Sequence, residues 1–294
     1  MLFASTALIL TAGSALGLAG TPVVDSRVSL RHGVADAAAT FAGAPGPPSR
    51  PVWPAAGAPG AAREIAGARG GLVSFAAIGP HGRVVGFHEN RRYVSASVVK
   101  AMLLVAELRR LRRGDMPLDA GTAGLLRAMI TASDNDAADQ IYYRVGDAGL
   151  NEVAERAGMA RFDVSGHWGN AQVTAADLAG FMWRLDGLLD LPHGGFGSEL
   201  LAGIVEYQRW GIPEVAPERA RLRFKGGWRP TDLGQLVHQV ARVDRRDQRY
   251  AVAVLTDAQP SMEHAIGTIK LISAELIRRD RPSRRRPSGG GSES

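Results

Sequence analysis

Segments with helical character lie between two groups of strand-like segments, and this order most constrains the fold. Two apolar runs, at residues 72–78 and 84–88, flank Gly79-Pro80-His81-Gly82, a pattern typical of a hairpin. Further strand-like runs come only after residue 220, at residues 222–225, 236–243 and 250–256. A strand buries its apolar face only against partners, so the early and late strands should join into one sheet. We therefore predict an α+β fold, with an antiparallel sheet flanked by helices and a mainly helical subdomain.

The intervening region has the periodicity of amphipathic helices. Residues 98–111 show an apolar face and end in a cluster of arginines, which suits a helix C-terminus. Residues 262–278 predict a closing helix after the last strand. The other predicted helices are residues 123–132, 136–145, 150–157, 175–185 and 198–207.

Proline and polar residues mark the ends of the folded region. Residues 42–60 contain six prolines among alanine and glycine, a composition that disfavours a helix or a central strand. We predict a linker over residues 25–62 and a folded domain over residues 63–279. Residues 280–294 consist mainly of arginine, serine, glycine and proline, and they predict a disordered basic tail.

The beginning of the chain has the composition of a targeting segment. Residues 1–24 carry no charged side chain, and Leu18-Ala19-Gly20 offers the small residues at which leader peptides are cleaved. This pattern predicts a signal peptide or membrane anchor over residues 1–24. We therefore expect the protein to be exported, and to be extracellular or associated with the cell envelope.

Charge and cysteine content exclude several classes of function. The formal net charge is +6, and residues 278–294 alone hold six arginines against two acidic residues. The rest of the chain carries too little positive charge to predict a nucleic-acid surface, although the tail could bind an anionic cell envelope. The chain has no cysteine, which excludes disulfides, thiolate catalysis and cysteine-ligated metals. We expect a monomer with no metal and no cofactor.

Lysine is rare in this chain, which makes each lysine informative. The sequence holds 32 arginines but only three lysines, Lys100, Lys225 and Lys270. A desolvated lysine can lose its proton and act as a base, whereas arginine cannot. A chain that prefers arginine so strongly keeps lysine where arginine cannot replace it.

The first lysine closes Ser97-Val98-Val99-Lys100, at the start of the helix predicted over residues 98–111. Residues three apart share a helix face, so Ser97 and Lys100 would lie about one turn apart. The amine could then accept the proton of the Ser97 hydroxyl, and the helix N-terminus favours negative charge there. Apolar neighbours would desolvate Lys100 and lower its pKa. The plainer interpretation is a capping serine and a surface lysine.

Two more short motifs follow. Ser133-Asp134-Asn135 comes after an apolar run, and a loop there could direct Ser133 and Asn135 into a cleft; the alternative is a helix cap. Lys225-Gly226-Gly227-Trp228 follows a strand-like run, where glycine lets a ligand or another backbone approach closely. Lys225 could supply positive charge for a carboxylate, and the alternative is a strand end followed by a turn.

Together and in this order, the three motifs resemble Ser-x-x-Lys, Ser-Asp-Asn and Lys-Thr-Gly of class A β-lactamases and penicillin-binding proteins. The resemblance spans roughly residues 71–279 and includes Thr174-Ala175-Ala176-Asp177-Leu178-Ala179, which opens a later helix. It implies a serine hydrolase with Ser97 as the acylated nucleophile and Lys100 as its base or proton relay. Ser133 would pass the proton to the leaving nitrogen, and Lys225 would support this relay.

The resemblance also implies a substrate-binding set. Asn135 would hold the substrate side chain, and Lys225 would support the substrate carboxylate. The strand segment Gly227-Trp228 would border the substrate, with the backbone N–H groups of Ser97 and Trp228 as the oxyanion hole. One departure affects this set, because Gly226 stands where the family has a hydroxyl that helps to bind the carboxylate.

A second departure affects the release of the acyl group. Class A enzymes hydrolyse the acyl-enzyme with a glutamate on a loop, and this chain has no glutamate between Glu155 and Glu199. The segment of residues 162–173 is also shorter than the corresponding loop of the family. His167, in His167-Trp168-Gly169-Asn170, and Asp163 are candidate substitute bases, although an exposed loop residue is the plainer interpretation of each.

We therefore expect an exported serine hydrolase that acts through an acyl-enzyme on β-lactams or related amide and peptide substrates, such as cell-wall peptides, with slow deacylation. The alternative is a catalytically impaired penicillin-binding or peptidoglycan-sensing module. A third interpretation is an unrelated globular protein in which the motifs occur by chance.

Overall fold

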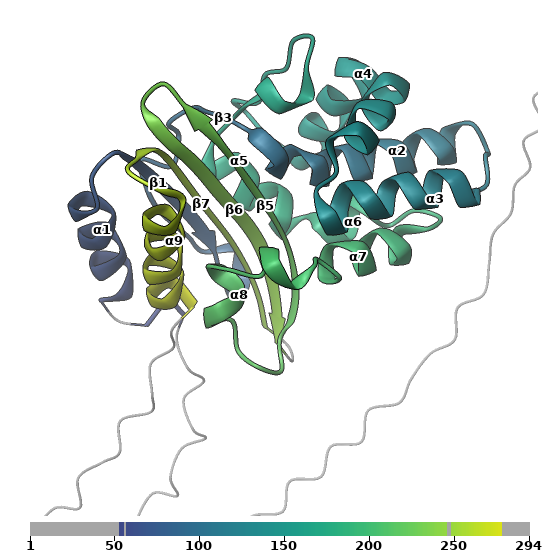
Figure 1. Cartoon of the computed structure of the whole chain (residues 1–294). Helices are drawn as coiled ribbons and strands as arrows, with labels where there is room; N and C mark the ends of the chain where they lie inside the picture. The colour runs from purple at the N-terminus through teal and green to yellow at the C-terminus, as the bar shows by residue number, and fades with distance from the viewer. Residues whose placement is uncertain (1–52, 56, 246–247, 278–294) are drawn as a thin grey trace, which may run out of the picture. The chain divides into compact units, whose positions relative to one another are not determined.

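A five-stranded antiparallel sheet forms the centre of the computed structural model, which describes residues 53–55, 57–245 and 248–277 (Figure 1). The strands lie in the order β2-β1-β7-β6-β5, so the first strands join the last ones. Leu72 lies opposite Asp257, for example, although the whole helical region separates them in sequence. The strand bounds are β1 (Leu72–Ile78), β2 (Val84–Phe87), β5 (Arg221–Thr231), β6 (Gly234–Arg245) and β7 (Gln248–Gln259). The predicted α+β class is confirmed.

Helices cover both faces of this sheet (Figure 1). Helix α9 (Met262–Ile277) packs on β6 and β7 and against α1 (Ala58–Ala68). Helix α5 (Ala175–Trp183) packs on β1, β6 and β7, and its apolar residues are almost all buried. Because neither face meets solvent, residues 236–243 of β6 are buried without alternation.

Except for α8 (Ile212–Val215), which packs on α9, the remaining helices form the predicted helical subdomain around α2 (Figure 1). Helix α2 (Lys100–Arg113) confirms the helix expected from residue 98, and it packs against α4 (Asn135–Ala157). Gly146 breaks α4 close to the gap between the two helices predicted there. The other elements are α3 (Ala120–Arg127), α6 (Leu185–Leu188) and α7 (Gly194–Ala202), together with the short strands β3 (Tyr93–Val94) and β4 (Gln172–Val173).

The folded part starts earlier than residue 63. Helix α1 begins at Ala58, inside the stretch predicted as linker, and the indole N–H of the buried Trp53 donates to the carbonyl of Leu276 at 2.7 Å. Pro59 does not prevent this helix, because a proline in the first turn has no intrahelical N–H bond to lose. Residues 1–52 and 278–294, with the predicted signal peptide and basic tail, lie outside the described residues.

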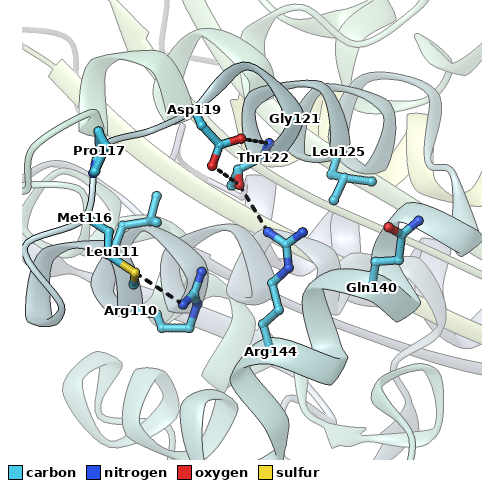
Figure 2. A pocket seen from close by; sticks show the side chains of 10 residues that line it. All are labelled: Arg110, Leu111, Met116, Pro117, Asp119, Gly121, Thr122, Leu125, Gln140 and Arg144. Atoms are coloured by element: carbon cyan, nitrogen blue, oxygen red, sulfur yellow. Dashed lines mark hydrogen bonds between the residues drawn. The ribbon is translucent and has the colours of Figure 1, made fainter.

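A pocket lies between the end of α2, the start of α3 and α4 (Figure 2). It lies near Leu111, about 16 Å along α2 from Lys100, given a rise of about 1.5 Å per residue. The two arginines that line this pocket, Arg110 and Arg144, both form ion pairs with the fully buried carboxylate of Glu107. This polar cluster therefore stabilises the helical subdomain and is separate from the motif residues.

Within the described ranges, no helix is long and apolar enough to span a bilayer.

Candidate active site

Ser97 lies in a 3₁₀ turn, Ala96–Val99, that leads directly into α2. Strand β5 runs against this turn at Gly227. A Cβ atom on Gly227 would lie 2.7 Å from the backbone nitrogen of Ser97 and 2.8 Å from that of Val98. Only glycine therefore allows this approach, and the Lys-Gly-Gly motif packs beside the half-buried Ser97.

Ser133 is held by a turn of π-helix, residues 128–132, that follows α3. Its backbone has φ 62°, a left-handed conformation that is uncommon outside glycine. Asp134 then caps α4 by accepting from the N–H of Ala137 at 2.7 Å, and Gln208 donates to the carbonyl of Ala132 at 2.9 Å. The cap that was an alternative to function is thus present, and it orients the Ser133-Asp134-Asn135 turn.

Lys100 is fully buried and reaches this turn. Its Nζ donates to the Ser133 carbonyl at 2.6 Å, the Asn135 Oδ1 at 2.7 Å and the Asp134 carbonyl at 3.2 Å, and it lies 3.4 Å from the Ser133 Oγ. None of the hydrogen bonds found for Lys100 in the described part of the chain goes to Ser97. Such contacts often tighten only when substrate is bound.

Lys225, also fully buried, completes the cluster from β5. Its Nζ donates to the Ser133 Oγ at 2.9 Å and to the Gly226 carbonyl at 3.0 Å. The Ser133 hydroxyl therefore lies between two buried amines. The structure brings together residues from three motifs that are separate in sequence.

Burial makes both amines more acidic than usual. Desolvation lowers the pKa of Lys100 to about 8, although the negative charges of Asp134 and Asp139 oppose this change. Desolvation, followed by repulsion from Lys100, holds the pKa of Lys225 well below its usual value. Lys100 can thus exchange protons near neutral pH, which a surface lysine does not do.

The segment of residues 162–173 meets Lys100 through an aromatic ring. The buried Trp168 lies with its ring centre 4.7 Å from Lys100 Nζ, a cation–π contact, and its indole N–H donates to Asp139 Oδ1 at 2.7 Å. The side chain of His167 stacks on Trp168 and is half exposed, and Asp163 is exposed. Neither candidate base has a contact with Lys100 or Ser97 among the described residues.

Comparison with known proteins places these observations in a family. The sequence model of the "Beta-lactamase enzyme family" matches residues 120–279, more than half of the chain. The chain belongs to this β-lactamase enzyme family. The resemblance inferred from the motifs is confirmed, and the interpretation that they occur by chance is excluded. The match covers Ser133 and Lys225 but begins after Ser97 and Lys100. The structure itself brings Lys100 to Ser133, and the Ser97 turn to the glycine that follows the Lys225-Gly226 pair.

Solved structures agree on the fold. A β-lactamase from Sphaerobacter thermophilus DSM 20745 is 21% identical, with a TM-score of 0.66 over 75% of this chain and 95% of that one. A β-lactamase from Burkholderia vietnamiensis is 20% identical, with a TM-score of 0.65 over 75% and 95% of the two chains. A class A β-lactamase from Mycobacterium abscessus is 19% identical, with a TM-score of 0.65 over 75% and 98%. No curated protein is similar enough to this chain to match it.

The predicted substrate-binding residues border the cluster. Asn135 begins α4 and is exposed at the turn, and its Oδ1 accepts from Lys100. Trp228 is half-buried on β5, and its ring meets that of Trp210 edge-to-face at 6.0 Å. For this β-lactamase family member, the structure thus places Gly227 and Trp228 beside the Ser97 turn through β5.

The sequence did not single out Trp168 or Trp210. Trp168 lies in the tetrapeptide that was noted for its histidine, and only the fold shows that the indole faces Lys100. Trp210 lies in a stretch without any motif, so no local signal could have found it. In residues 53–55, 57–245 and 248–277, no three histidine, aspartate or glutamate side chains gather as metal ligands would.

Proposed function

We propose that this protein is a serine hydrolase whose Ser97 becomes acylated by β-lactams or by related amide and peptide substrates. The acyl group is then released slowly by hydrolysis. One observation carries the proposal: the Ser133 hydroxyl lies between the buried amines of Lys100 and Lys225, while Trp168 meets Lys100 with a ring instead of a carboxylate.

Acylation uses the polar side of this cluster. The Ser97 hydroxyl oxygen attacks the substrate carbonyl carbon, and its proton passes to the neutral amine of Lys100. The backbone N–H groups of Ser97 and Trp228 stabilise the negative charge that develops on the carbonyl oxygen. The C–N bond then breaks, and a proton from the Ser133 hydroxyl passes to the leaving nitrogen. Lys100 then returns the proton that it took from Ser97 to the Ser133 oxygen, while Lys225 stays hydrogen-bonded to the same side chain.

Deacylation needs a second base. A water molecule must attack the Ser97 ester and lose a proton, and then Ser97 leaves as the alcohol. A positioned general base contributes about 10²–10⁴ to the rate of such a step. Because Trp168 occupies the face of Lys100 toward residues 162–173, this step lacks a carboxylate contact and should be slow.

The same feature supports the second candidate, a penicillin-binding or peptidoglycan-sensing module. If no group activates water, the acyl-enzyme persists and the protein reports on a ligand instead of consuming it. Export and association with the cell envelope stay predictions, since residues 1–24 and 278–294 lie outside the described part of the chain.

Intact-protein mass measurement with benzylpenicillin, followed over time, tests the proposal. We expect a mass increase of one penicillin that decays slowly, and a burst near one equivalent in stopped-flow measurements with a chromogenic cephalosporin. Ser97→Ala should abolish the adduct, a loss of about 10³-fold or more. Ser165→Ala, a change at an exposed serine, is the matched control and should label normally.

The outcomes separate the candidates. Rapid turnover without a burst would contradict slow deacylation, and an adduct that never decays would favour the binding module. An undiminished adduct in Ser97→Ala, or no adduct on the unmodified chain with benzylpenicillin or with its esters, would contradict the proposed function itself.

A further inference from the structure

Trp210 covers the position where the family has a hydroxyl side chain. A Cβ atom on Gly226 would lie 3.1 Å and 3.2 Å from two atoms of the Trp210 indole ring. A serine or threonine at residue 226 would therefore press on this ring from its first side-chain atom. The missing hydroxyl side chain at Gly226 and the indole of Trp210 therefore go together, because the ring takes up the space that such a side chain would need.

The indole is held there by the sheet. Gln239 on β6 lies directly opposite Gly226 on β5, and its side chain is fully buried. Its Nε2 donates to the Trp210 carbonyl at 2.8 Å, and its Oε1 accepts from the N–H of Ile212 at 2.7 Å. Gly211 between them has φ 71°, so the chain turns around the amide of Gln239. The N–H donor and the oxygen acceptor of one buried amide therefore both fix the backbone that carries Trp210.

The Trp228 ring completes an aromatic pair beside Gly226. The two rings meet edge-to-face, at 6.0 Å and 74°, an arrangement that aromatic pairs favour. Trp228 follows Gly227, which packs on the Ser97 turn, so one ring of the pair belongs to the strand that borders the nucleophile. Both rings are half-buried, so each keeps surface for a ligand.

The neighbouring cations are engaged elsewhere. Lys225 has no exposed surface, and its amine bonds to Ser133 and to the Gly226 carbonyl. Arg229 donates to Asn170 Oδ1 at 3.0 Å, on the segment that carries Trp168. The guanidinium of Arg209 lies 5.4 Å from the Phe224 ring and donates to the Ala202 carbonyl. The surface beside Gly226 itself consists of indole rings, against which a carboxylate would lose hydration.

We propose that Trp210 and Trp228 form a subsite for the part of the substrate next to the leaving nitrogen, and that it takes an uncharged apolar or aromatic group in place of a carboxylate. The inference rests on the proposed acylation of Ser97. Lys225 then serves the proton relay through Ser133 and does not anchor an anion. Binding of an apolar group against the two rings is favourable because it removes apolar surface from water. A carboxylate is disfavoured there because it loses hydration.

Three forms of one β-lactam test this subsite: benzylpenicillin, its methyl ester and its benzyl ester. They share the reacting ring and differ only at the carboxylate beside the lactam nitrogen. Their second-order rates of Ser97 acylation should rise from the acid to the methyl ester to the benzyl ester, by about tenfold or more overall, as expected for a matched apolar pocket. Trp210→Ala should reduce the preference for the benzyl ester over the acid by a similar factor, as judged by the same rates.

Tyr207→Ala is the matched control, because Tyr207 is an exposed aromatic residue three positions before Trp210. It should leave the order of the three rates unchanged. Thermal unfolding checks that each variant folds, and the substrate series on the unmodified chain decides the proposal even where Trp210→Ala does not fold.

Equal rates for the three compounds, or a faster rate for the acid, would overturn the subsite while leaving the proposed function intact. A preference for the acid that Arg229→Ala removes would assign the anchor to Arg229 instead. Failure of all three compounds to label Ser97 would overturn the proposed function and this inference with it.

Discussion

Two segments meet the amine of Lys100, and they differ in what they offer it. The turn at residues 133–135 presents oxygen acceptors, with the closest at 2.6 Å from Nζ. The segment at residues 162–173 presents the ring of Trp168, with no carboxylate or imidazole contact. Both contacts accommodate a cation, but only the first includes a hydroxyl that can carry a proton.

This difference separates the two halves of the reaction. In the proposed mechanism the polar turn and Lys225 serve acylation, because they connect Ser133 to two amines. The aromatic segment lies where a base for hydrolysis would be expected from the resemblance to class A enzymes. The proposed function thus assigns the two half-reactions to two segments that are separate in sequence.

The largest effect should come from removing the amine that both segments share. Lys100→Met cannot accept a proton, and Lys100→Arg keeps its charge at all accessible pH values. Each change should lower the burst rate of Ser97 acylation by about 10²–10⁴, the usual contribution of a general base. Lys270→Met, a change at the exposed lysine that pairs with Glu214, is the control and should acylate normally. Acylation within threefold of normal in a folded Lys100→Arg would exclude Lys100 as the base.

A carboxylate at residue 168 should give the second segment, like the first, an oxygen acceptor for Lys100. In Trp168→Glu, the new carboxylate would replace the ring beside Lys100 and could take a proton from water. We expect the adduct on Ser97 to decay about tenfold faster. This gain is smaller than the rate factor of about 10²–10⁴ that a well-positioned general base contributes. His167→Glu places the same charge one residue away, on a half-exposed side chain, and should leave the decay unchanged. Equal acceleration in both variants, measured by loss of the mass adduct, would show that general charge and not the position at residue 168 matters.

The pH dependence of acylation should report the buried amine. Burial lowers the pKa of Lys100 to about 8, so the neutral amine that accepts a proton becomes more abundant as the pH rises. The burst rate should increase about tenfold per pH unit below pH 8 and level off above it. Stopped-flow measurements between pH 6 and 10 check this profile. A rate that falls as the pH rises through 8 would contradict a neutral Lys100 as the acceptor.

The smallest effect should come from Asp139, which links the two segments. Its carboxylate accepts from the Trp168 indole, and its negative charge raises the pKa of Lys100. Asp139→Asn keeps an oxygen acceptor but removes the charge, so the midpoint of the pH profile should move to lower pH by less than about one unit. Acylation at pH 7 should then be a few-fold faster. Asp136→Asn, on an exposed side chain of the same helix, should leave the midpoint in place, and a shift to higher pH in Asp139→Asn would contradict the assignment.

The sequence alone determined much of the fold and the identity of the polar cluster. Apolar periodicity is a local property of the chain, so the hairpin at β1 and β2, helix α2 and the closing helix α9 followed from it. The three motifs are also local. Their order carried the resemblance to a known family, which implied that Lys225 supports the Ser133 relay, and the structure brings these two side chains to 2.9 Å.

Only the tertiary structure decided what surrounds that cluster. Trp168 meets Lys100 because two segments far apart in sequence pack together, and Trp210 covers Gly226 because Gln239 on a neighbouring strand binds the backbone around it. The start of α1 at Ala58 was hidden for a similar reason, since burial of its alanines against the fold outweighs a proline-rich composition. Contacts between distant residues leave no periodicity and no motif in the chain, because their energy depends on shape and burial that exist only once the chain has folded.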